Sequence, residues 1–243
     1  MVELLACPLC SGRLSESSTA FVCRGCHRVY PLLDGAPNLL LARPSAPSNN
    51  AFGFVSRGFQ SATTRPFVYD LVQKLAGARQ ILGRIGSTLE ESASALVLDV
   101  GGGTGNLEAL LPASARYLWL DSDPEKLRGF RAKSQSPAIL ADATSIPLRS
   151  GAVDTAVSVA VSHHLSDRQL GRMLDELRRV ATNLFFLDAV ITPRRVSRLL
   201  WHYDQGRYPR TAGQLRSEIE ARFAIESDEE FSVYHRYLLV TAS

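Results

Sequence analysis

The chain has 243 residues, of which 45% are hydrophobic and 21% are charged, which is the composition of a folded globular protein. Its formal net charge of +3 is too small to identify a nucleic-acid-binding protein by itself. No apolar run approaches the roughly 18 residues of a membrane helix, and the N-terminus lacks the regions of a signal peptide. We therefore expect a cytoplasmic protein with one large domain and room for a small module.

All four cysteines lie near the N-terminus, where Cys7 and Cys10 form one Cys-x-x-Cys pair and Cys23 and Cys26 form a second. In a reducing compartment, two such pairs predict a tetrahedral thiolate site with a structural zinc ion. Two alternatives are four unrelated free cysteines and, because His27 follows Cys26, a haem attachment motif. Haem attachment would leave the first pair unexplained. We therefore expect one zinc ion bound by all four cysteines.

The rest of this N-terminal module reads as short strands at 20–22 and 28–33, with a hairpin turn at Asp34 and Gly35. The stretch YPLLDGAPNLL, together with the leading CPLC, resembles the small zinc-ribbon proteins of the Trm112 type over residues 1–41. Some members of that family activate methyltransferase partners. The resemblance thus leaves two roles open, a purely structural zinc or a docking surface for a protein partner. The Pro-rich and Ser-rich residues that follow predict a linker over 42–65.

A repeating order of strands and helices occupies the rest of the chain. Apolar residues at helical spacing predict an amphipathic helix from residue 66 to Ile85. The alternation that follows predicts an α/β domain over 66–243 with a doubly wound, mostly parallel sheet. The expected strands are 95–100, 117–120, 138–140, 153–161, 184–190, 225–231 and 234–241. The expected helices begin at 106 and span 124–132, 166–181 and 211–223.

The loop after strand 95–100 reads DVGGGTG over residues 99–105. Glycines there let the backbone approach a ligand at the carboxyl edge of the sheet. The dinucleotide-binding fingerprint needs a further glycine at position 106, where Asn106 stands. The pattern instead resembles motif I of the class I S-adenosylmethionine-dependent methyltransferases. That family implies a seven-stranded, Rossmann-like methyltransferase fold.

Three more segments match this family in order. Asp121 follows the second strand, where a carboxylate can accept hydrogen bonds from both ribose hydroxyls. Asp142 and Ala143 follow the third strand, where the family contacts the adenine. Residues 158–165, SVAVSHHL, follow the fourth strand, where the family places substrate-facing groups. The resemblance implies that S-adenosylmethionine is bound by Asp99, Gly101, Gly103, Gly105, Asp121, Asp142 and Ala143.

Three of these acidic residues have structural alternatives. Asp99 could tie down the glycine loop, Asp142 could be a turn residue, and Asp121 could cap a helix. Asp123, just before Pro124, is the better N-cap. We therefore keep the cofactor role for Asp121.

His163 and His164 lie where a general base would help a hydroxyl nucleophile. On an extended segment, their side chains point in opposite directions, so at most one faces the methyl group. We favour His164 slightly. The alternative is that both histidines only line or pack the site.

Segment 191–216 holds six arginines against one acid, Asp204, and follows the fifth strand, where relatives insert a substrate-covering cap. An arginine fork binds phosphate or carboxylate in two hydrogen bonds. The alternative is a solvated amphipathic helix. We take this segment as a cap for an anionic substrate, with Arg194, Arg195, Arg198 and Tyr203 as its candidate ligands.

Taken together, the motifs predict a methyltransferase of a small molecule, a lipid headgroup or a glycan. A methyltransferase of ribosomal or transfer RNA is the first alternative, because a zinc ribbon also precedes a bacterial ribosomal-RNA guanine methyltransferase. That enzyme differs in its second knuckle and its fourth motif, and RNA binding favours a more basic surface. The second alternative is a non-catalytic scaffold that docks a partner through the ribbon. The intact glycine loop and Asp121 oppose it.

Overall fold

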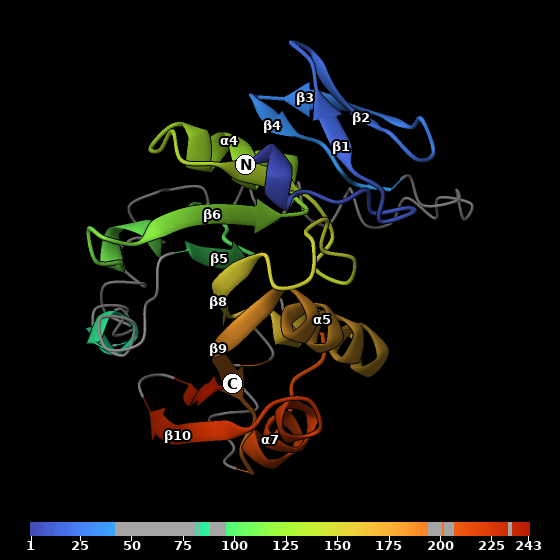
Figure 1. The fold of residues 1–243 in the computed structure, drawn as a ribbon. Helices are drawn as coiled ribbons and strands as arrows, with labels where there is room; N and C mark the ends of the chain where they lie inside the picture. Colours follow the sequence, from blue (N-terminus) through green and yellow to red (C-terminus); the bar gives the residue numbers. More distant parts are fainter. Residues whose placement is uncertain (42–80, 82, 88–95, 194–200, 202–206, 233–234) are drawn as a thin grey trace.

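The computed structural model describes residues 1–41, 81, 83–87, 96–193, 201, 207–232 and 235–243. Two sheets are present in these ranges. The small sheet has the order β1-β2-β3-β4, and the large sheet has the order β10-β11-β9-β8-β5-β6-β7. Figure 1 shows the small sheet near the β6 and β7 end of the large one, with β10 at the opposite end. The predicted α/β fold with a seven-stranded sheet and an N-terminal ribbon is confirmed.

The ribbon is an antiparallel meander that follows one short 3-10 turn. Asp34 and Gly35 form its two-residue hairpin turn, with φ angles of 47° and 73°. Positive φ at both positions is what this tight turn requires, and it confirms the predicted hairpin. The elements are η1 (Val2–Leu4), β1 (Leu14–Glu16), β2 (Ala20–Cys23), β3 (Val29–Leu33) and β4 (Ala36–Pro37).

In the large sheet, the first five strands along the chain run parallel, and β11 pairs antiparallel with β9 on one side and with β10 on the other. β5 pairs with both β6 and β8, so the chain builds the sheet outward from β5 in two directions. Ligands of such sheets bind outside the carboxyl ends of the strands at this switch point. The strands are β5 (Leu96–Val100), β6 (Arg116–Asp121), β7 (Ala138–Leu140), β8 (Val153–Val159), β9 (Ala181–Val190), β10 (Ile225–Ser232) and β11 (Arg236–Ala242).

The helices begin at local capping signals. The side chain of Asp123 accepts a hydrogen bond of 2.8 Å from the N–H of Glu125, and Pro124 opens the helix, as predicted. None of the helices in the described part of the chain is long and apolar enough to cross a membrane. They are α4 (Pro124–Arg131), α5 (Asp167–Val180), α7 (Ala212–Glu220), η2 (Glu108–Leu110) and η3 (Ser162–His164).

Three predicted elements need correction. The helix expected from residue 106 is only the 3-10 turn η2, because Pro112 disfavours helical backbone at Leu111, which is extended. Strand β8 ends at Val159, two residues early, and β9 already begins at Ala181. Of the helix expected over 66–85, only residues 81 and 83–85 are described, and they are helical.

The ribbon shares its core with the large sheet. A single cluster of buried side chains contains Leu5, Phe21 and Leu39 of the ribbon segment together with Leu118 of β6 and Ile139 of β7. Burial of these apolar side chains away from water stabilises both parts at once.

Backbone hydrogen bonds add to this junction. The N–H of Leu39 donates to the carbonyl of Leu140 at 2.9 Å, and Asn38 forms a parallel bridge with the same residue. Elsewhere in the junction, the N–H of Ala6 donates to the carbonyl of Pro147 at 2.9 Å. The chain after β4 therefore covers the edge strand β7, which would otherwise present unpaired backbone groups.

Candidate functional site

The four cysteines come together in the ribbon. Their Sγ atoms all lie within 4.8 Å of one another, with 3.7 Å between Cys7 and Cys26 and 3.5 Å between Cys10 and Cys23. A tetrahedral zinc ion with Zn–S bonds of about 2.3 Å separates its sulfurs by about 3.8 Å. The predicted ligand set therefore fits zinc, and the grouping of both pairs favours zinc over haem.

Groups around the cluster favour thiolates at Cys23 and Cys7. The N–H groups of Cys26 and Gly25 each lie 3.4 Å from Sγ of Cys23, and they lower the pKa of that thiol to about 6. The Tyr30 hydroxyl lies 3.0 Å from Sγ of Cys7, where it can donate to a thiolate. Such outer contacts orient metal ligands.

The glycine loop leaves the carboxyl end of β5, at the switch point of the sheet. Gly101 and Gly105 have φ angles of 71° and 77°, which side chains rarely tolerate. A Cβ atom on Gly101 would lie 2.5 Å from the Val161 side chain, and one on Gly105 would strike the ring of Phe130. The loop is thus wedged between the turn after β8 and helix α4, with its backbone toward the crevice where a ligand binds.

Asp99 lies beneath this loop. Its side chain is only 3% exposed, and Oδ2 accepts a hydrogen bond of 2.5 Å from the hydroxyl of Tyr117. Burial raises the pKa of Asp99 to about 7. Trp119, from the same strand as Tyr117, donates from Nε1 to the carbonyl of Gly103 at 3.1 Å. Asp99 is thus held by Tyr117, whereas Trp119 is the side chain that binds the loop, and the contact of Asp99 with a cofactor stays a prediction.

Asp121 ends strand β6 beside the loop. Its Oδ2 accepts from the N–H of Gly103 and its Oδ1 from the N–H of Asp123, each at 3.0 Å. Burial raises the pKa of Asp121, while the N–H donors of Asp123 and Gly103 oppose that shift. The carboxylate is therefore locked against the glycine loop. Each carboxylate oxygen has a second lone pair, so hydrogen bonds from ribose hydroxyls remain compatible with this geometry.

Asp142 and Ala143 lie at the same edge, just after β7. Oδ1 of Asp142 accepts from the N–H and from the hydroxyl of Thr144, both at 2.8 Å, which makes Asp142 a turn residue. Ala143 is partly buried against the core. The predicted contacts of both residues with the adenine stay predictions.

The two histidines do not lie on an extended segment, so the expectation of opposed side chains is wrong. Strand β8 ends early because Ala160 turns the chain at a φ angle of 58°, and the histidines fall in η3. Their ring centroids are 4.2 Å apart. His163 is buried, with Nδ1 2.6 Å from Oδ1 of Asp188 on β9, whereas His164 is exposed. The structure therefore separates the two candidates by environment.

The arginines of segment 191–216 do not act as one group. Arg194, Arg195, Arg198 and Tyr203, the candidate substrate ligands, lie outside the described residues. Arg210 is buried and binds the side chain of Asp167 at 2.8 Å. Arg216 pairs with acidic residues of β10 at 2.6 and 2.8 Å. At least two of the six positive charges are thus used within the protein, which the charge count did not reveal.

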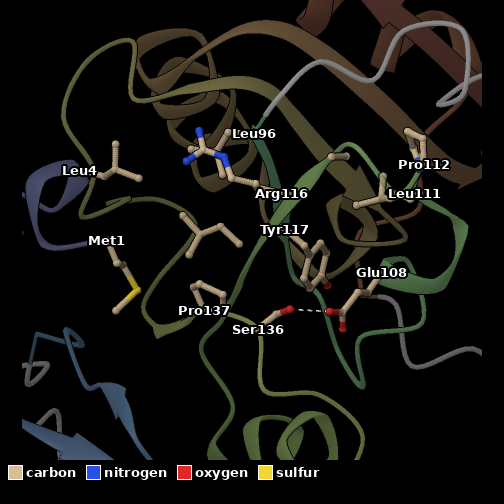
Figure 2. A pocket seen from close by; sticks show the side chains of 13 residues that line it. Met1, Leu4, Leu96, Glu108, Leu111, Pro112, Arg116, Tyr117, Ser136 and Pro137 are labelled. Carbon is tan, nitrogen blue, oxygen red and sulfur yellow. Dashed lines mark hydrogen bonds between the residues drawn. The ribbon is translucent and has the colours of Figure 1, made fainter.

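A separate cavity of about 440 Å³ lies at the opposite, amino-terminal edge of β5 and β6. Figure 2 shows Met1 and Leu4 on one side of it, and Ser136 hydrogen-bonded to Glu108 near Tyr117. Because ligands of open parallel sheets bind at the carboxyl edge, this cavity is not the cofactor site.

Three contacts around the candidate residues were not predicted from the sequence. Asp188 is the only acidic residue in the apolar run LFFLDAV, and a lone buried acid is a signal that could have been used. Nothing in the sequence distinguishes Arg210 from its neighbours. Tyr117, the partner of Asp99, reads as an ordinary strand residue.

Two family models match the chain. A methyltransferase domain matches residues 98–183, and a Trm112p-like protein matches residues 1–35. A UPF0434 protein of Psychromonas ingrahamii is 36% identical over 52 residues, which are 21% of this chain and 88% of that protein. The sequence matches thus cover the ribbon and the large sheet from β5 to the start of β9.

Solved structures share the fold at low identity. The PH0226 protein of Pyrococcus horikoshii is 16% identical with a TM-score of 0.58, over 68% of this chain and 90% of its own. Magnesium protoporphyrin IX methyltransferase of Synechocystis, solved with bound SAH, is 17% identical with a TM-score of 0.56. The match covers 78% of this chain and 98% of that enzyme. The complex between the Haloferax volcanii Trm112 methyltransferase activator and a methyltransferase contains a chain that is 14% identical with a TM-score of 0.55. The match covers 71% of this chain and 95% of that chain.

Proposed function

The chain is an S-adenosylmethionine-dependent methyltransferase of class I with an N-terminal Trm112-like zinc ribbon, and from that premise we propose that it methylates a small molecule, a lipid headgroup or a glycan. One observation carries the proposal. The turn that bears the histidines packs directly on the glycine loop, since a Cβ atom on Gly101 would lie 2.5 Å from Val161. A proton acceptor and the cofactor cradle therefore share one edge of the sheet.

The residues of this edge fit the cofactor. Asp121 is held against the glycine loop by the N–H of Gly103, so a ribose bound by the carboxylate lies over the loop. S-adenosylmethionine supplies an electrophilic methyl group on a sulfonium sulfur. The contribution of the protein is then to hold the acceptor in line with that methyl group and to take its proton.

Of the two histidines, His163 is the better base in this proposal. Its Nδ1 is engaged by the buried carboxylate of Asp188, which fixes the ring and would stabilise an imidazolium formed by proton transfer. His164, at 4.2 Å between ring centroids, lines the same turn. This reverses the slight preference for His164 that the sequence suggested.

The acceptor class rests on two considerations. The string PLRSGAVDTAVSVAVSHHLSD over 147–167 resembles the small-molecule branch of the family, which supports a small acceptor over RNA. Anionic character rests on Arg194, Arg195 and Arg198, because Arg210 and Arg216 already have protein partners. Replacing those three by Gln should raise KM for the acceptor and leave the affinity for S-adenosylmethionine unchanged.

The ribbon has a structural role within the chain in this proposal. It covers the edge strand β7 next to Asp142, with Leu39 donating to the carbonyl of Leu140. Leu9 and Val29 are large apolar side chains of the ribbon that are 56% and 59% exposed, and they are the residues we would expect a protein partner to contact. Such a partner stays a prediction.

Two measurements test the proposal. Calorimetry should show one S-adenosylmethionine per chain, and Asp121→Ala should weaken binding by about 1–3 kcal/mol, the cost of lost hydrogen bonds to a charged group. Asp123→Asn is the matched control, because Asn also caps helices. Methyl-labelled cofactor should then label small-molecule, lipid or glycan fractions of a cell extract. Label in the RNA fraction would favour the RNA alternative, and absence of binding would reject the proposal.

A further inference from the structure

Two aromatic side chains, Trp119 of β6 and Phe130 of α4, form a platform beneath the glycine loop. Both are fully buried, and their rings stack with 5.3 Å between the ring centroids and 6° between the ring planes. A Cβ atom on Gly102 would lie 2.5 Å from Cδ1 of Trp119, and one on Gly105 would lie 2.4 Å from the ring of Phe130. Two glycines of the loop therefore rest directly on aromatic rings, which leave no room for a side chain at either position.

Gly103, the middle glycine of the loop, is bound at both of its backbone polar groups. Its carbonyl accepts from Nε1 of Trp119 at 3.1 Å, and its N–H donates to Oδ2 of Asp121 at 3.0 Å. Both partners belong to β6, the strand that pairs with β5. Because the stack with Phe130 fixes the indole, the position of the loop relative to Asp121 depends on Trp119.

Tyr117 lies two residues before Trp119 on the same face of β6, and it acts on Asp99 instead of the loop. Its hydroxyl donates to Oδ2 of Asp99 at 2.5 Å, and among the described residues no other side chain donates to this carboxylate. Burial raises the pKa of Asp99, the hydroxyl of Tyr117 opposes that rise, and the charge of Asp121 adds to it. Glu108 is the other acid near the Tyr117 hydroxyl (Figure 2). Tyr117 therefore favours the charged form of Asp99 in a place where burial favours the neutral acid.

The order of the strands indicates which end of the cofactor lies over Asp99. Along the sheet, β8, β5, β6 and β7 are successive neighbours. Asp121 ends β6 and Asp142 follows β7, so a cofactor with its ribose at Asp121 and its adenine at Asp142 extends its methionine end over β5. That end carries an ammonium group, and Asp99 is the acid of β5. In surroundings of low dielectric constant, a buried carboxylate attracts a nearby ammonium group even without direct contact.

We propose that Tyr117 and Trp119 are positioning residues for the cofactor with different tasks: Trp119 holds the glycine loop for the adenosine part, and Tyr117 holds the Asp99 carboxylate for the ammonium of the methionine part. The inference rests on the proposed function and deepens it, because it adds two residues to the cofactor site. Both residues come from one face of β6, so a single strand supports both halves of the site. The two tasks predict different losses for ligands with and without the amino-acid end.

Calorimetry of the full-length, zinc-loaded protein with three ligands separates these tasks. S-adenosylmethionine and S-adenosylhomocysteine carry the amino-acid end, and 5′-methylthioadenosine lacks it. Tyr117→Phe should weaken binding of the first two by about tenfold, the lower end of the scale for a hydrogen bond to a charged group, and of the third by less than about twofold. Trp119→Phe should weaken all three by about fivefold, because it loosens the loop. Tyr237→Phe, at a buried tyrosine of β11 that stacks on Phe231, is the matched control and should bind all three like the wild type.

Two further measurements show whether Tyr117 acts through Asp99. Asp99→Asn should give the same ligand pattern, and adding Tyr117→Phe to it should cause less than about a twofold further loss. Raising the pH from about 7 to about 8.5 should restore part of the affinity of Tyr117→Phe for S-adenosylhomocysteine, relative to the wild type, because Asp99 ionises again. The charge of Asp121 acts on Asp99 in the wild type and the variant alike.

A measurement on the wild type tests Trp119 without a substitution in the core. The Nε1–H of Trp119 should exchange with solvent more slowly when S-adenosylhomocysteine is bound, because the ligand holds the loop whose carbonyl accepts from it. An unchanged exchange rate would overturn the role of Trp119. For Tyr117, an equal loss for all three ligands, or no loss for any, would overturn the inference and leave the methyltransferase assignment intact. A wild-type protein that binds none of the three ligands would instead remove the proposed function itself.

Discussion

Replacing Leu39 by Ala tests whether the ribbon and the methyltransferase sheet fold as one unit. The Leu39 side chain is 1% exposed and lies in the core cluster that contains Leu118 and Ile139. Its backbone hydrogen bond to Leu140 does not depend on the side chain, so the substitution removes only buried apolar contacts. A buried Leu→Ala change costs about 2–5 kcal/mol, and about 3 kcal/mol lowers Tm of a chain this size by roughly 6–12 °C.

Urea unfolding with two probes measures this effect. The two tryptophans, Trp119 and Trp201, lie outside the ribbon and report on the large sheet, whereas zinc release to a coloured chelator reports on the ribbon. Both midpoints should fall together in Leu39→Ala with an unchanged m value, because the two parts share one core.

Leu9→Ala is the control within the ribbon. Leu9 is 56% exposed, so its loss should change the free energy of unfolding by less than about 0.5 kcal/mol. The reasoning is refuted if Leu39→Ala shifts only zinc release and leaves the tryptophan midpoint at its wild-type value. The ribbon would then be an independent module.

Three further predictions concern the metal, the loop and pH. Chelation of zinc should lower Tm and weaken S-adenosylmethionine binding, and unchanged affinity in calorimetry would contradict the coupling through β7. Gly105→Ala should abolish binding, because its Cβ meets the ring of Phe130 at a φ angle of 77°. Gly151→Ala, at φ 62° in open space, should still bind. The pKa of Asp99 is raised to about 7, so between about pH 4 and 7 the folded protein holds a proton that the unfolded chain releases, and stability falls as pH rises through that window. Asp99→Asn should remove that fall in urea unfolding at pH 5 and pH 7, and an identical slope in both proteins would refute it.

Features with short-range causes were predictable from the sequence. The hairpin at Asp34 and Gly35 follows from the φ angles of two residues, and the start of α4 follows from Asp123 and Pro124. The cysteine spacing predicted the whole ligand set, because two tight knuckles bring four sulfurs together with little choice of geometry. The glycine loop was equally local. The shortness of η2 was not predicted, because it depends on the effect of Pro112 on the backbone of the preceding residue.

The candidate base illustrates the limit of this approach. Two adjacent histidines on a strand would point apart, and only the left-handed backbone at Ala160 ends the strand before them. Alanine gives no sequence signal for such a conformation. The sequence therefore predicted the wrong geometry for His163 and His164, and their role as a base stays a prediction.

By itself, the sequence determined the cluster of four cysteines, the order of strands and helices, and the glycine loop after β5, since each depends on residues that are neighbours along the chain. The tertiary structure alone decided that Asp188 holds His163 and that Arg210 holds the turn, across 25 and 48 positions of sequence. It also decided that the chain after the ribbon strands covers the edge strand β7. Contacts of this kind depend on which strands lie side by side, and a residue carries no local mark of the partner that the sheet order will bring to it.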